Sequence, residues 1–478
     1  MKRALALLAA CSACSASHAS GGLGPDDTGP GDACAMPAPT AMVADLLAHN
    51  TSANAAYDAA HFPANFGSAT WISQAGATMP VDPAAADLSL NAVTPGHVSN
   101  VDVHTLIPSR PDLRWFAHVV PWFRGGGGGG HIDIGIETDS AEYVAAMLAD
   151  LKRRGFDGLI VDWYGQGSYE DQVTLLVQQA LAADPTNTFT FIVMMDKGIP
   201  GLSSATLVSQ LAYLRAQYWS DRNYERESGK PIVMFFGVDS ALGATAMTQI
   251  KAASAPDAVW VTEGASSLAQ SYVDEAFDWT HADLSGPVAD DPYNVGSVAA
   301  YYAAVGAQAK PAFGSIAAGF DGMLTKTVAW SEGKYLPRGD GACIVQWASK
   351  IDSVIPANVT RMQWATWNDW EEGTAVEPGV ENSLVVAAAV DGGVVSWTVT
   401  GGTGDESTVD HYEVYATLDS TSAYLVGSAP VGAHSFSLAS SSRWCWLSGA
   451  TSASVSVVAV AKPMLRDHAS PWLPLTPP

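Results

Sequence analysis

The sequence predicts an α/β protein in which a (β/α)8 barrel is followed by an all-β sandwich. Three observations lead to this prediction. Short apolar runs alternate with amphipathic segments from Arg114 onward, and eight such runs fit into about 250 residues, as a barrel requires. After about Leu384 the chain changes to short alternating segments rich in Val, Ser and Thr. An open doubly wound sheet is the alternative fold, and it would need fewer strands and a switch point.

Residues 1–40 have the composition of a leader followed by a flexible tether. Met1-Lys2-Arg3 is basic and precedes a short apolar stretch, which is the pattern of an export signal. Leu8-Ala9-Ala10-Cys11 resembles a lipobox, in which the cysteine is lipidated; the alternative is an ordinary cleaved signal that removes Cys11. We therefore predict an exported protein that is secreted or is lipid-anchored through Cys11 in a bacterial cell envelope.

The overall composition limits the partners of the protein. Of 478 residues, 23 are Lys or Arg and 48 are Asp or Glu, so the formal net charge is −25. A surface this negative repels phosphate backbones, so we predict no nucleic-acid partner. The five cysteines match no metal-ligand spacing and define no disulfide connectivity, and no other motif indicates a metal or cofactor. We predict a monomer that contacts the membrane only through a lipid anchor.

Residues 41–113 show no clear period and are predicted to form an irregular N-terminal cap on the barrel. The barrel is predicted over residues 114–383. Its expected strands are Trp115–Val120, Gly158–Asp162, Phe189–Met195, Pro231–Phe236, Ala258–Thr262, Ala276–Trp279, Pro311–Ser315 and Met362–Trp367. Amphipathic segments such as Ser140–Arg154 and Leu202–Tyr218, with apolar residues at helical spacing, predict the connecting helices.

Residues 384–478 are predicted to form the sandwich. Val395, Trp397 and Val399 alternate with polar residues, as expected for strands with one buried face. The stretch Asp410–Tyr415 resembles the central strand of a fibronectin type III domain. We expect a spacer or weak glycan-binding module, with Trp444 and Trp446 facing the same side of a strand.

Aromatic and acidic residues gather where the barrel strands are expected to end, and these ends hold the reactive groups of barrel enzymes. Strand one ends in Pro121-Trp122-Phe123, strand two in Val161-Asp162-Trp163-Tyr164-Gly165, and strand eight in Thr366–Thr374. Aromatic faces stack on sugar rings, and carboxylates bind hydroxyl groups. A single tryptophan at a strand end more often covers the core, but three such clusters favour a carbohydrate-binding cleft.

The segment after strand eight provides candidate catalytic residues. If it is helical, Asp369 and Glu372 share a face, and two close carboxylates can divide the roles of acid and base. A solvated acidic loop is the alternative. The predicted catalytic residues are Asp369 and Glu372, and the predicted substrate-binding residues are Trp122, Asp162, Trp163, Tyr164, Trp367, Asn368, Trp370 and Glu371. Weaker candidates for hydroxyl binding or structural ion pairs are Asp196 with Lys197, Asp239, Glu263 and Asp278.

The segment Trp367–Pro378 resembles the terminal-strand signature of glycoside hydrolase family 99, the endo-α-mannosidases. Arg154–Gly165 and Pro121-Trp122-Phe123 are similar to the ends of that family's second and first strands. This resemblance implies that Asp369 deprotonates the sugar's 2-hydroxyl, which attacks the anomeric carbon, while Glu372 protonates the leaving oxygen. The chain departs from the family because it has Asp369 in place of Glu and Glu371 in place of His.

From the residues and the resemblance together we predict an exported glycoside hydrolase acting on α-linked glycans or polysaccharides. An α-1,3-glucanase-like hydrolase is one alternative. A non-catalytic surface lipoprotein that binds carbohydrate is the other, because it would use the same aromatic residues.

Overall fold

The computed structural model describes residues 36, 38–42, 70–72, 78–80, 98–123, 132–133, 138–281, 290–321, 335–377, 379–401 and 406–475. Residues Met36–Pro478 form one compact unit. The predicted leader, including Cys11, lies outside the described residues, as does most of the predicted cap. Within the described part, no helix combines the length and the apolar character that crossing a membrane requires.

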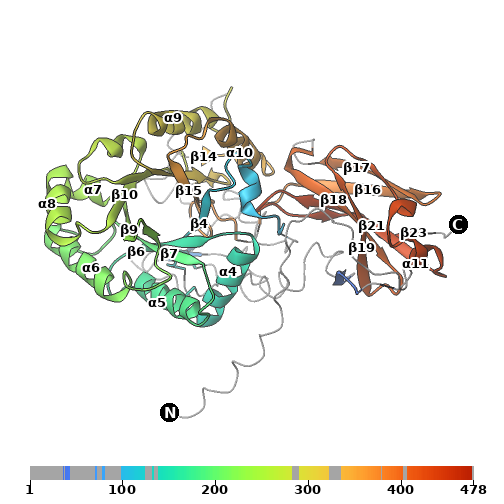
Figure 1. The fold of residues 1–478 in the computed structure, drawn as a ribbon, viewed down its shortest axis with the longest axis horizontal. Helices are drawn as coiled ribbons and strands as arrows, with labels where there is room; N and C mark the ends of the chain where they lie inside the picture. The colour runs from blue at the N-terminus through green and yellow to red at the C-terminus, as the bar shows by residue number, and fades with distance from the viewer. Residues whose placement is uncertain are drawn as a thin grey trace, which may run out of the picture. The chain divides into compact units, whose positions relative to one another are not determined.

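Eight parallel strands form a closed barrel (Figure 1). They are β4 (Arg114–Val119), β6 (Gly158–Trp163), β7 (Thr190–Asp196), β9 (Lys230–Phe236), β10 (Val259–Glu263), β11 (Glu275–Phe277), β12 (Ala312–Ile316) and β15 (Val359–Trp364). Their order is β10-β11-β12-β15-β4-β6-β7-β9, and pairing of β9 with β10 closes the ring. The predicted barrel is confirmed, and the open-sheet alternative is wrong.

Helices surround this barrel (Figure 1). They are α4 (Ala141–Arg153), α5 (Tyr169–Ala182), α6 (Ser204–Gln217), α7 (Val238–Leu242), α8 (Ala244–Ser254), α9 (Val295–Gly306) and α10 (Ala342–Val354). Serine side chains cap three of them, because Ser140, Ser168 and Ser203 each accept a hydrogen bond from a backbone amide in the first helical turn. The helices predicted over 140–154 and 202–218 correspond to α4 and α6.

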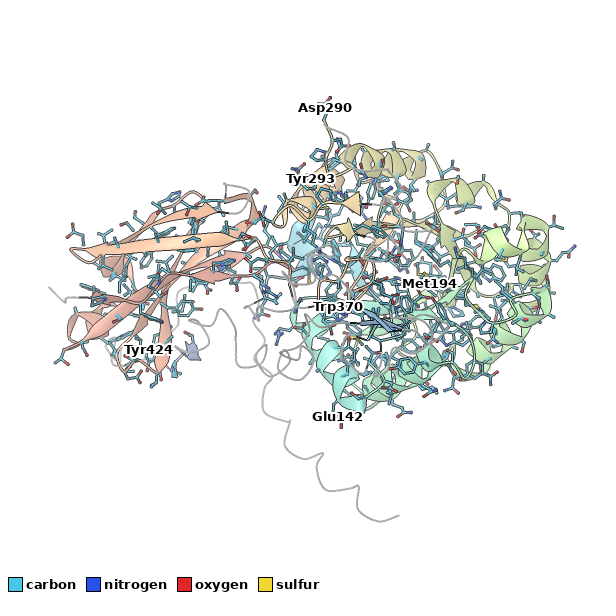
Figure 2. All side chains as sticks on the ribbon, turned by 180° about the vertical axis from the view of Figure 1, so that it is seen from behind. Glu142, Met194, Asp290, Tyr293, Trp370 and Tyr424 are labelled. Atoms are coloured by element: carbon cyan, nitrogen blue, oxygen red, sulfur yellow. The ribbon has the colours of Figure 1, made fainter. Side chains whose placement is uncertain are left out.

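The barrel strands alternate between two cores. On β4, Trp115 and Ala117 pack toward the helices, whereas Phe116 belongs to the cluster that fills the barrel. The interior cluster contains Phe116, Ile160, Ile192, Met194, Ile232, Met234, Val259, Val261, Phe277 and Phe313. Met194 is labelled in Figure 2. Every second residue of a strand faces the barrel interior. A polar residue two positions beyond the last interior apolar residue therefore lies at the end of the interior where the strand ends.

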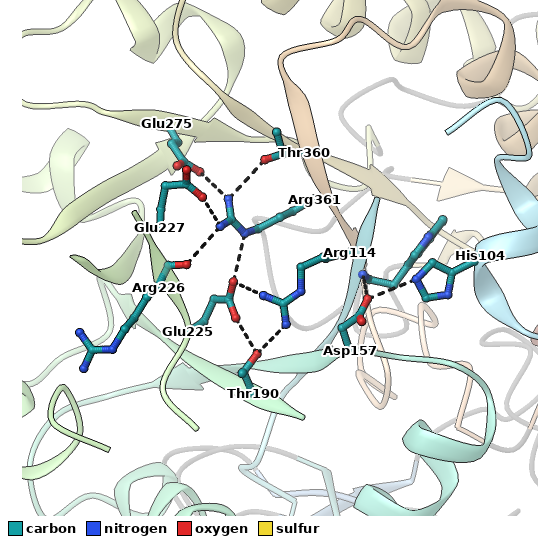
Figure 3. Close-up of polar contacts among 11 residues, drawn as sticks. His104, Arg114, Asp157, Thr190, Glu225, Arg226, Glu227, Glu275, Thr360 and Arg361 are labelled. Atoms are coloured by element: carbon teal, nitrogen blue, oxygen red, sulfur yellow. Dashed lines mark hydrogen bonds and ion pairs between the residues drawn. The ribbon is translucent and has the colours of Figure 1, made fainter. Parts of the chain in front are cut away.

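A partly buried polar network occupies the N-terminal end of the barrel (Figure 3). It contains Arg114, Thr190, Glu225, Glu227, Glu275 and Arg361. Glu225 pairs with Arg114, accepts a 2.7 Å hydrogen bond from the Thr190 hydroxyl and lies 3.4 Å from Nε of Arg361. This end is thus closed by arginines matched to glutamates.

The C-terminal region contains antiparallel sheets, and the predicted sandwich is confirmed. One sheet contains β16 (Leu384–Asp391), β17 (Val394–Gly401) and β20 (Ser435–Ser437). The other contains β18 (Val409–Thr417), β19 (Ser422–Pro430), β21 (Ala453–Ala461), β22 (His468–Ala469), β23 (Leu473–Leu475) and β1 (Ala41–Met42). Because β1 pairs with β19, Ala41–Met42 joins the sandwich although it falls within the predicted cap.

One expectation for the sandwich needs correction. Trp444 and Trp446 lie in the short helix α11 (Trp444–Ser448) and not on a strand; Trp446 packs on Tyr424, so its ring serves the core.

The tail also contributes to the packing of the barrel, because Met464 and Leu465 belong to the same hydrophobic core as the barrel helices. Its role as a spacer or weak glycan-binding module stays a prediction.

Candidate active site

Three polar side chains lie at the C-terminal end of the barrel interior. His118, Asp162 and Asp196 each follow an interior residue by two positions, on β4, β6 and β7 respectively. Their exposed fractions are only 0%, 6% and 7%. Nε2 of His118 lies 3.9 Å from Oδ2 of Asp162. The strands thus bring one imidazole and two carboxyl groups together at the barrel mouth.

The burial of this group sets its protonation. Burial, together with the charge of Asp162, raises the pKa of Asp196 to about 7, against the opposing effects of the Gly198 amide, Lys197 and His118. Burial lowers the pKa of His118 to about 3. At neutral pH, the His118 ring is therefore uncharged, and Asp196 holds a proton in about half of the molecules.

Aromatic rings flank these carboxyl groups. Trp122 stacks on Tyr164 with ring centroids 5.7 Å apart and planes at 24°. The Tyr164 ring lies against Gly198, since a Cβ atom added there would be 3.3 Å from Cζ of Tyr164 and 2.9 Å from Oδ1 of Asp196. On another side, the His118 and Trp279 rings meet edge to face at 4.8 Å. Flat apolar surfaces and hydrogen-bonding groups thus lie side by side, as sugar binding requires.

The acidic loop after β15 differs from its predicted form. The strand was expected to run to Trp367, but it ends at Trp364, and the carboxylate-bearing segment is a turn and not a helix. Side chains compete for the backbone here: the Thr366 hydroxyl accepts from the amide of Asp369, and Asp369 Oδ1 accepts from the amides of Glu371 and Glu372, at 3.0 Å each. Asp369 therefore fixes the direction of the two glutamates that follow it.

Buried arginines and an asparagine hold this loop in place. The Asn368 amide pairs with both the N–H and the C=O of Val120, at 2.8 and 3.0 Å, and so joins the loop to the end of β4. Arg338 donates to the carbonyls of Gly373 and Ala375. Arg154 donates to the Glu377 carbonyl at 3.1 Å. The loop is thus fixed before any ligand binds.

The loop and the carboxyl groups at the ends of β6 and β7 converge on Tyr164. Burial raises the pKa of the Tyr164 hydroxyl well above its ordinary value, and the carboxylates of Asp162, Asp196, Glu170 and Glu371 raise it further. The charge of Glu371 in the acidic loop thus acts on the same hydroxyl group as the charges of Asp162 and Asp196. This convergence connects the acidic loop to the barrel mouth.

The structure brings together only part of the predicted site. Trp122, Asp162, Tyr164 and Glu371 form the cluster described above. Trp163, Trp367 and Asn368 are fully buried and make structural contacts: Nε1 of Trp163 donates to Asp171 at 3.0 Å, and Arg154 lies over the Trp367 ring. Trp370, labelled in Figure 2, is 2% exposed. These four residues hold the loop and the strands rather than present an open face.

The predicted catalytic pair and the weaker candidates of the sequence differ in their exposure. Asp369 is buried as the turn cap, and Glu372 is partly exposed. Asp239 accepts a 3.3 Å hydrogen bond from the Tyr272 hydroxyl, Asp278 lies 2.8 Å from Nε2 of His281, and Glu263 is exposed at the end of β10.

Within the described ranges, no three His, Cys, Asp or Glu side chains are arranged to hold a metal ion.

Sequence reasoning did not select His118 and gave Asp196 only a minor place. A signal was present for both, because a polar residue two positions beyond an inward apolar residue, next to a strand end, faces the barrel mouth. Reading the alternation of each barrel strand to its end would have found them.

Comparison with known proteins gives fold-level similarities. No family model matches the chain, and no curated protein matches it. Among solved structures, the GH99 endo-alpha-mannosidase from Bacteroides thetaiotaomicron is 13% identical, with a TM-score of 0.45 over 55% of this chain and 87% of that one. The same enzyme in complex with BIS-TRIS-propane is 14% identical, with a TM-score of 0.43 over 55% and 86% of the two chains.

A glycoside hydrolase family 5 structure from Bacteroides vulgatus is 11% identical, with a TM-score of 0.33 over 71% of this chain and 90% of that one. These similar structures are glycoside hydrolases. The similarity is distant, so the activity of this chain has to be argued from its own site.

Proposed function

We propose that this protein is a glycoside hydrolase that cleaves α-linked glycans or polysaccharides at the C-terminal mouth of its barrel. The observation that carries the proposal is the convergence of Asp162, Asp196 and Glu371 on Tyr164, whose ring stacks on Trp122. Carboxyl groups beside stacked aromatic rings are the components that glycoside hydrolysis uses.

The proposed bond cleavage uses the two carboxyl groups of the acidic loop. Glu372 donates a proton to the glycosidic oxygen as the bond between this oxygen and the anomeric carbon breaks, and the leaving sugar departs as an alcohol. The sugar's 2-hydroxyl gives its proton to Asp369 as its oxygen forms a bond to the anomeric carbon. Water then breaks this bond: its hydroxyl group goes to the anomeric carbon, its proton goes to Glu372, and Asp369 returns its proton to the 2-oxygen. The hydrogen bonds from the Glu371 and Glu372 amides orient the Asp369 carboxyl group for this role.

We also propose export and anchoring, on the basis of the basic start, the short apolar stretch and Cys11. Expression in a bacterial host followed by fractionation tests this. The wild-type protein should enter the membrane fraction with a lipid on Cys11, detected by mass spectrometry, whereas Cys11→Ser should not. A wild-type protein without lipid that appears in the medium would indicate simple secretion.

The experiment that tests the activity is a screen of the purified protein against α-mannans and α-glucans, with reducing-sugar release as the readout. We expect release from at least one polysaccharide, and we expect Glu372→Gln and Asp369→Asn to lower the rate by at least about 10²-fold. Asn retains a capping oxygen, so the second variant should keep the turn. Glu142→Gln, on the surface of α4 (Figure 2), is the matched control and should hydrolyse at the wild-type rate.

Two outcomes would contradict this function. Binding of a polysaccharide without any release of sugar would indicate the carbohydrate-binding lipoprotein. Hydrolysis that survives in both loop variants would show that other carboxyl groups carry out the reaction.

A further inference from the structure

We propose that Asp162 and Asp196 form a carboxyl pair, with a proton retained on Asp196, that binds two neighbouring hydroxyl groups of one sugar ring. This inference rests on the proposed function and extends it to residues outside the acidic loop. One protonated and one ionised group provide a donor and an acceptor side by side. That combination fits two adjacent hydroxyls, each of which both donates and accepts.

The geometry places both carboxyl groups on the interior side of adjacent strands. The β6–β7 register pairs Asp162 with Met194, so Asp196 lies two residues farther along β7 on the same face. Oδ1 of Asp196 accepts from the Gly198 amide at 2.5 Å, which fixes the orientation of this carboxyl group. Gly198 also lets the Tyr164 ring approach Asp196. The pair is thus held rigidly next to an aromatic face.

A second observation points to a ligand at this place. His118 is fully buried and directed at Asp162, and its one hydrogen-bonding neighbour besides that carboxyl group is the Gln363 side chain, which leaves a ring nitrogen without a partner within the described residues. In the described part, the Oγ atom of Ser315 on β12 also lacks a partner. Buried polar atoms are normally satisfied, so this group of atoms fits a hydroxyl-rich ligand or the water that it displaces.

The charged groups around the pair agree with a retained proton. Asp196 faces Asp162 from β6, Lys197 from its own strand end and His118 from β4, while Tyr164, Glu170 and Glu371 complete the surroundings. Burial outweighs the favourable effect of Lys197, and the pKa of Asp196 is about 7. His118 opposes this rise as well, but less than Lys197 does, and burial lowers its own pKa to about 3. As pH rises through 7, Asp196 loses the donor that the proposed contact requires.

Carbohydrate affinity measured against pH tests the proposal. The probes are the α-mannan and α-glucan oligosaccharides of the screen, and the protein carries Glu372→Gln so that none is cleaved. We expect affinity to fall above about pH 7, approaching tenfold per pH unit. Adding Asp196→Asn, which mimics the protonated acid, should make affinity independent of pH. Adding Asp162→Asn removes the neighbouring charge, so the fall should begin at lower pH.

An infrared titration of the ligand-free protein provides a readout that is independent of carbohydrate. A carboxylic-acid C=O band should disappear as pH rises through about 7. Glu275, whose pKa is also raised to about 7, contributes to this band as well. Asp196→Asn should therefore remove the part of the band that Glu275→Gln leaves, and the folding of both variants is checked by their melting temperatures.

Each outcome decides a different claim. A pH-independent affinity in the Glu372→Gln protein, or a band that Asp196→Asn leaves unchanged, would overturn the carboxyl pair and leave the proposed hydrolysis intact. If no α-glycan binds at any pH, the proposed function fails and the hydroxyl-binding role fails with it.

Discussion

The two ends of the barrel interior both bury ionisable groups, but they treat them differently. At the N-terminal end, Arg361 contacts Glu225, Glu227 and Glu275 (Figure 3). At the C-terminal end, Asp196 lies near a second carboxyl group and a neutral imidazole. At the first end, arginine and glutamate side chains form ion pairs with one another. At the second end, the proposed role of the carboxyl groups is to form hydrogen bonds with a substrate. A buried charge without a matched opposite charge lowers stability, so its presence indicates function.

A raised pKa does not by itself distinguish the two ends. Burial raises the pKa of Glu275 to about 7 as well, even though Arg361 lies 3.6 Å away and lowers it. The difference lies in the neighbours, because Glu275 has a guanidinium beside it and Asp196 has another carboxyl group. The surroundings of a buried acid are therefore more informative than its pKa.

The largest effect on stability is expected from breaking the N-terminal network. Arg361→Met would leave Glu225 and Glu275 buried without this partner, and we expect the free energy of unfolding to fall by about 3–5 kcal/mol. Urea denaturation measures this change. Arg215→Ala removes an exposed pair with Asp257 and is the matched control, with an expected loss below about 1 kcal/mol. Equal losses in the two variants would contradict a structural role for the network.

At the C-terminal end, a substitution is expected to raise the free energy of unfolding instead of lowering it. The pKa of Asp196 is higher in the folded protein than the ordinary 3.8, so the folded state loses stability as pH rises from about 4 to about 7. Asp196→Asn removes this penalty and should stabilise the protein at pH 8 by up to about 4 kcal/mol, with no gain at pH 4. Urea denaturation at both pH values tests this. A loss of stability at pH 8 would mean that Asp196 is a structural group.

The smallest effect concerns a histidine at the N-terminal end. His104 lies 2.7 Å from Asp102 and 3.3 Å from Asp157, and these partners raise its pKa to about 9. Its stabilising contribution is therefore complete below about pH 6.5 and is lost as pH rises through about 9. His104→Gln should cost about 1 kcal/mol at pH 6 and almost nothing at pH 10, as measured by thermal unfolding. Equal costs at both pH values would rule out the ion pairs as the cause. His118, at the other end, has its pKa lowered.

The barrel could be predicted from the sequence because its strands are continuous apolar runs separated by amphipathic helices. The end of the last strand could not be predicted, because Trp364, the last residue of β15, and Trp367, which follows the strand, are both buried in the same core. The turn at Asp369 depends on hydrogen bonds among Thr366, Asp369 and Glu372 that helical spacing does not reveal. Similarly, the cluster around Asp196 arises from strand register, which brings together residues far apart in the chain.

One crossed measurement tests the central claim, that the C-terminal end carries out chemistry and the N-terminal end maintains the fold. It compares Asp162→Asn with Glu225→Gln for melting temperature and for kcat/KM on the glycan that the wild-type protein cleaves, below both melting temperatures. We predict that Asp162→Asn keeps the melting temperature and lowers kcat/KM by about 10²-fold. Glu225→Gln should lower the melting temperature and change kcat/KM by less than about threefold. The reverse pattern, with activity lost at Glu225 and stability lost at Asp162, would contradict the account.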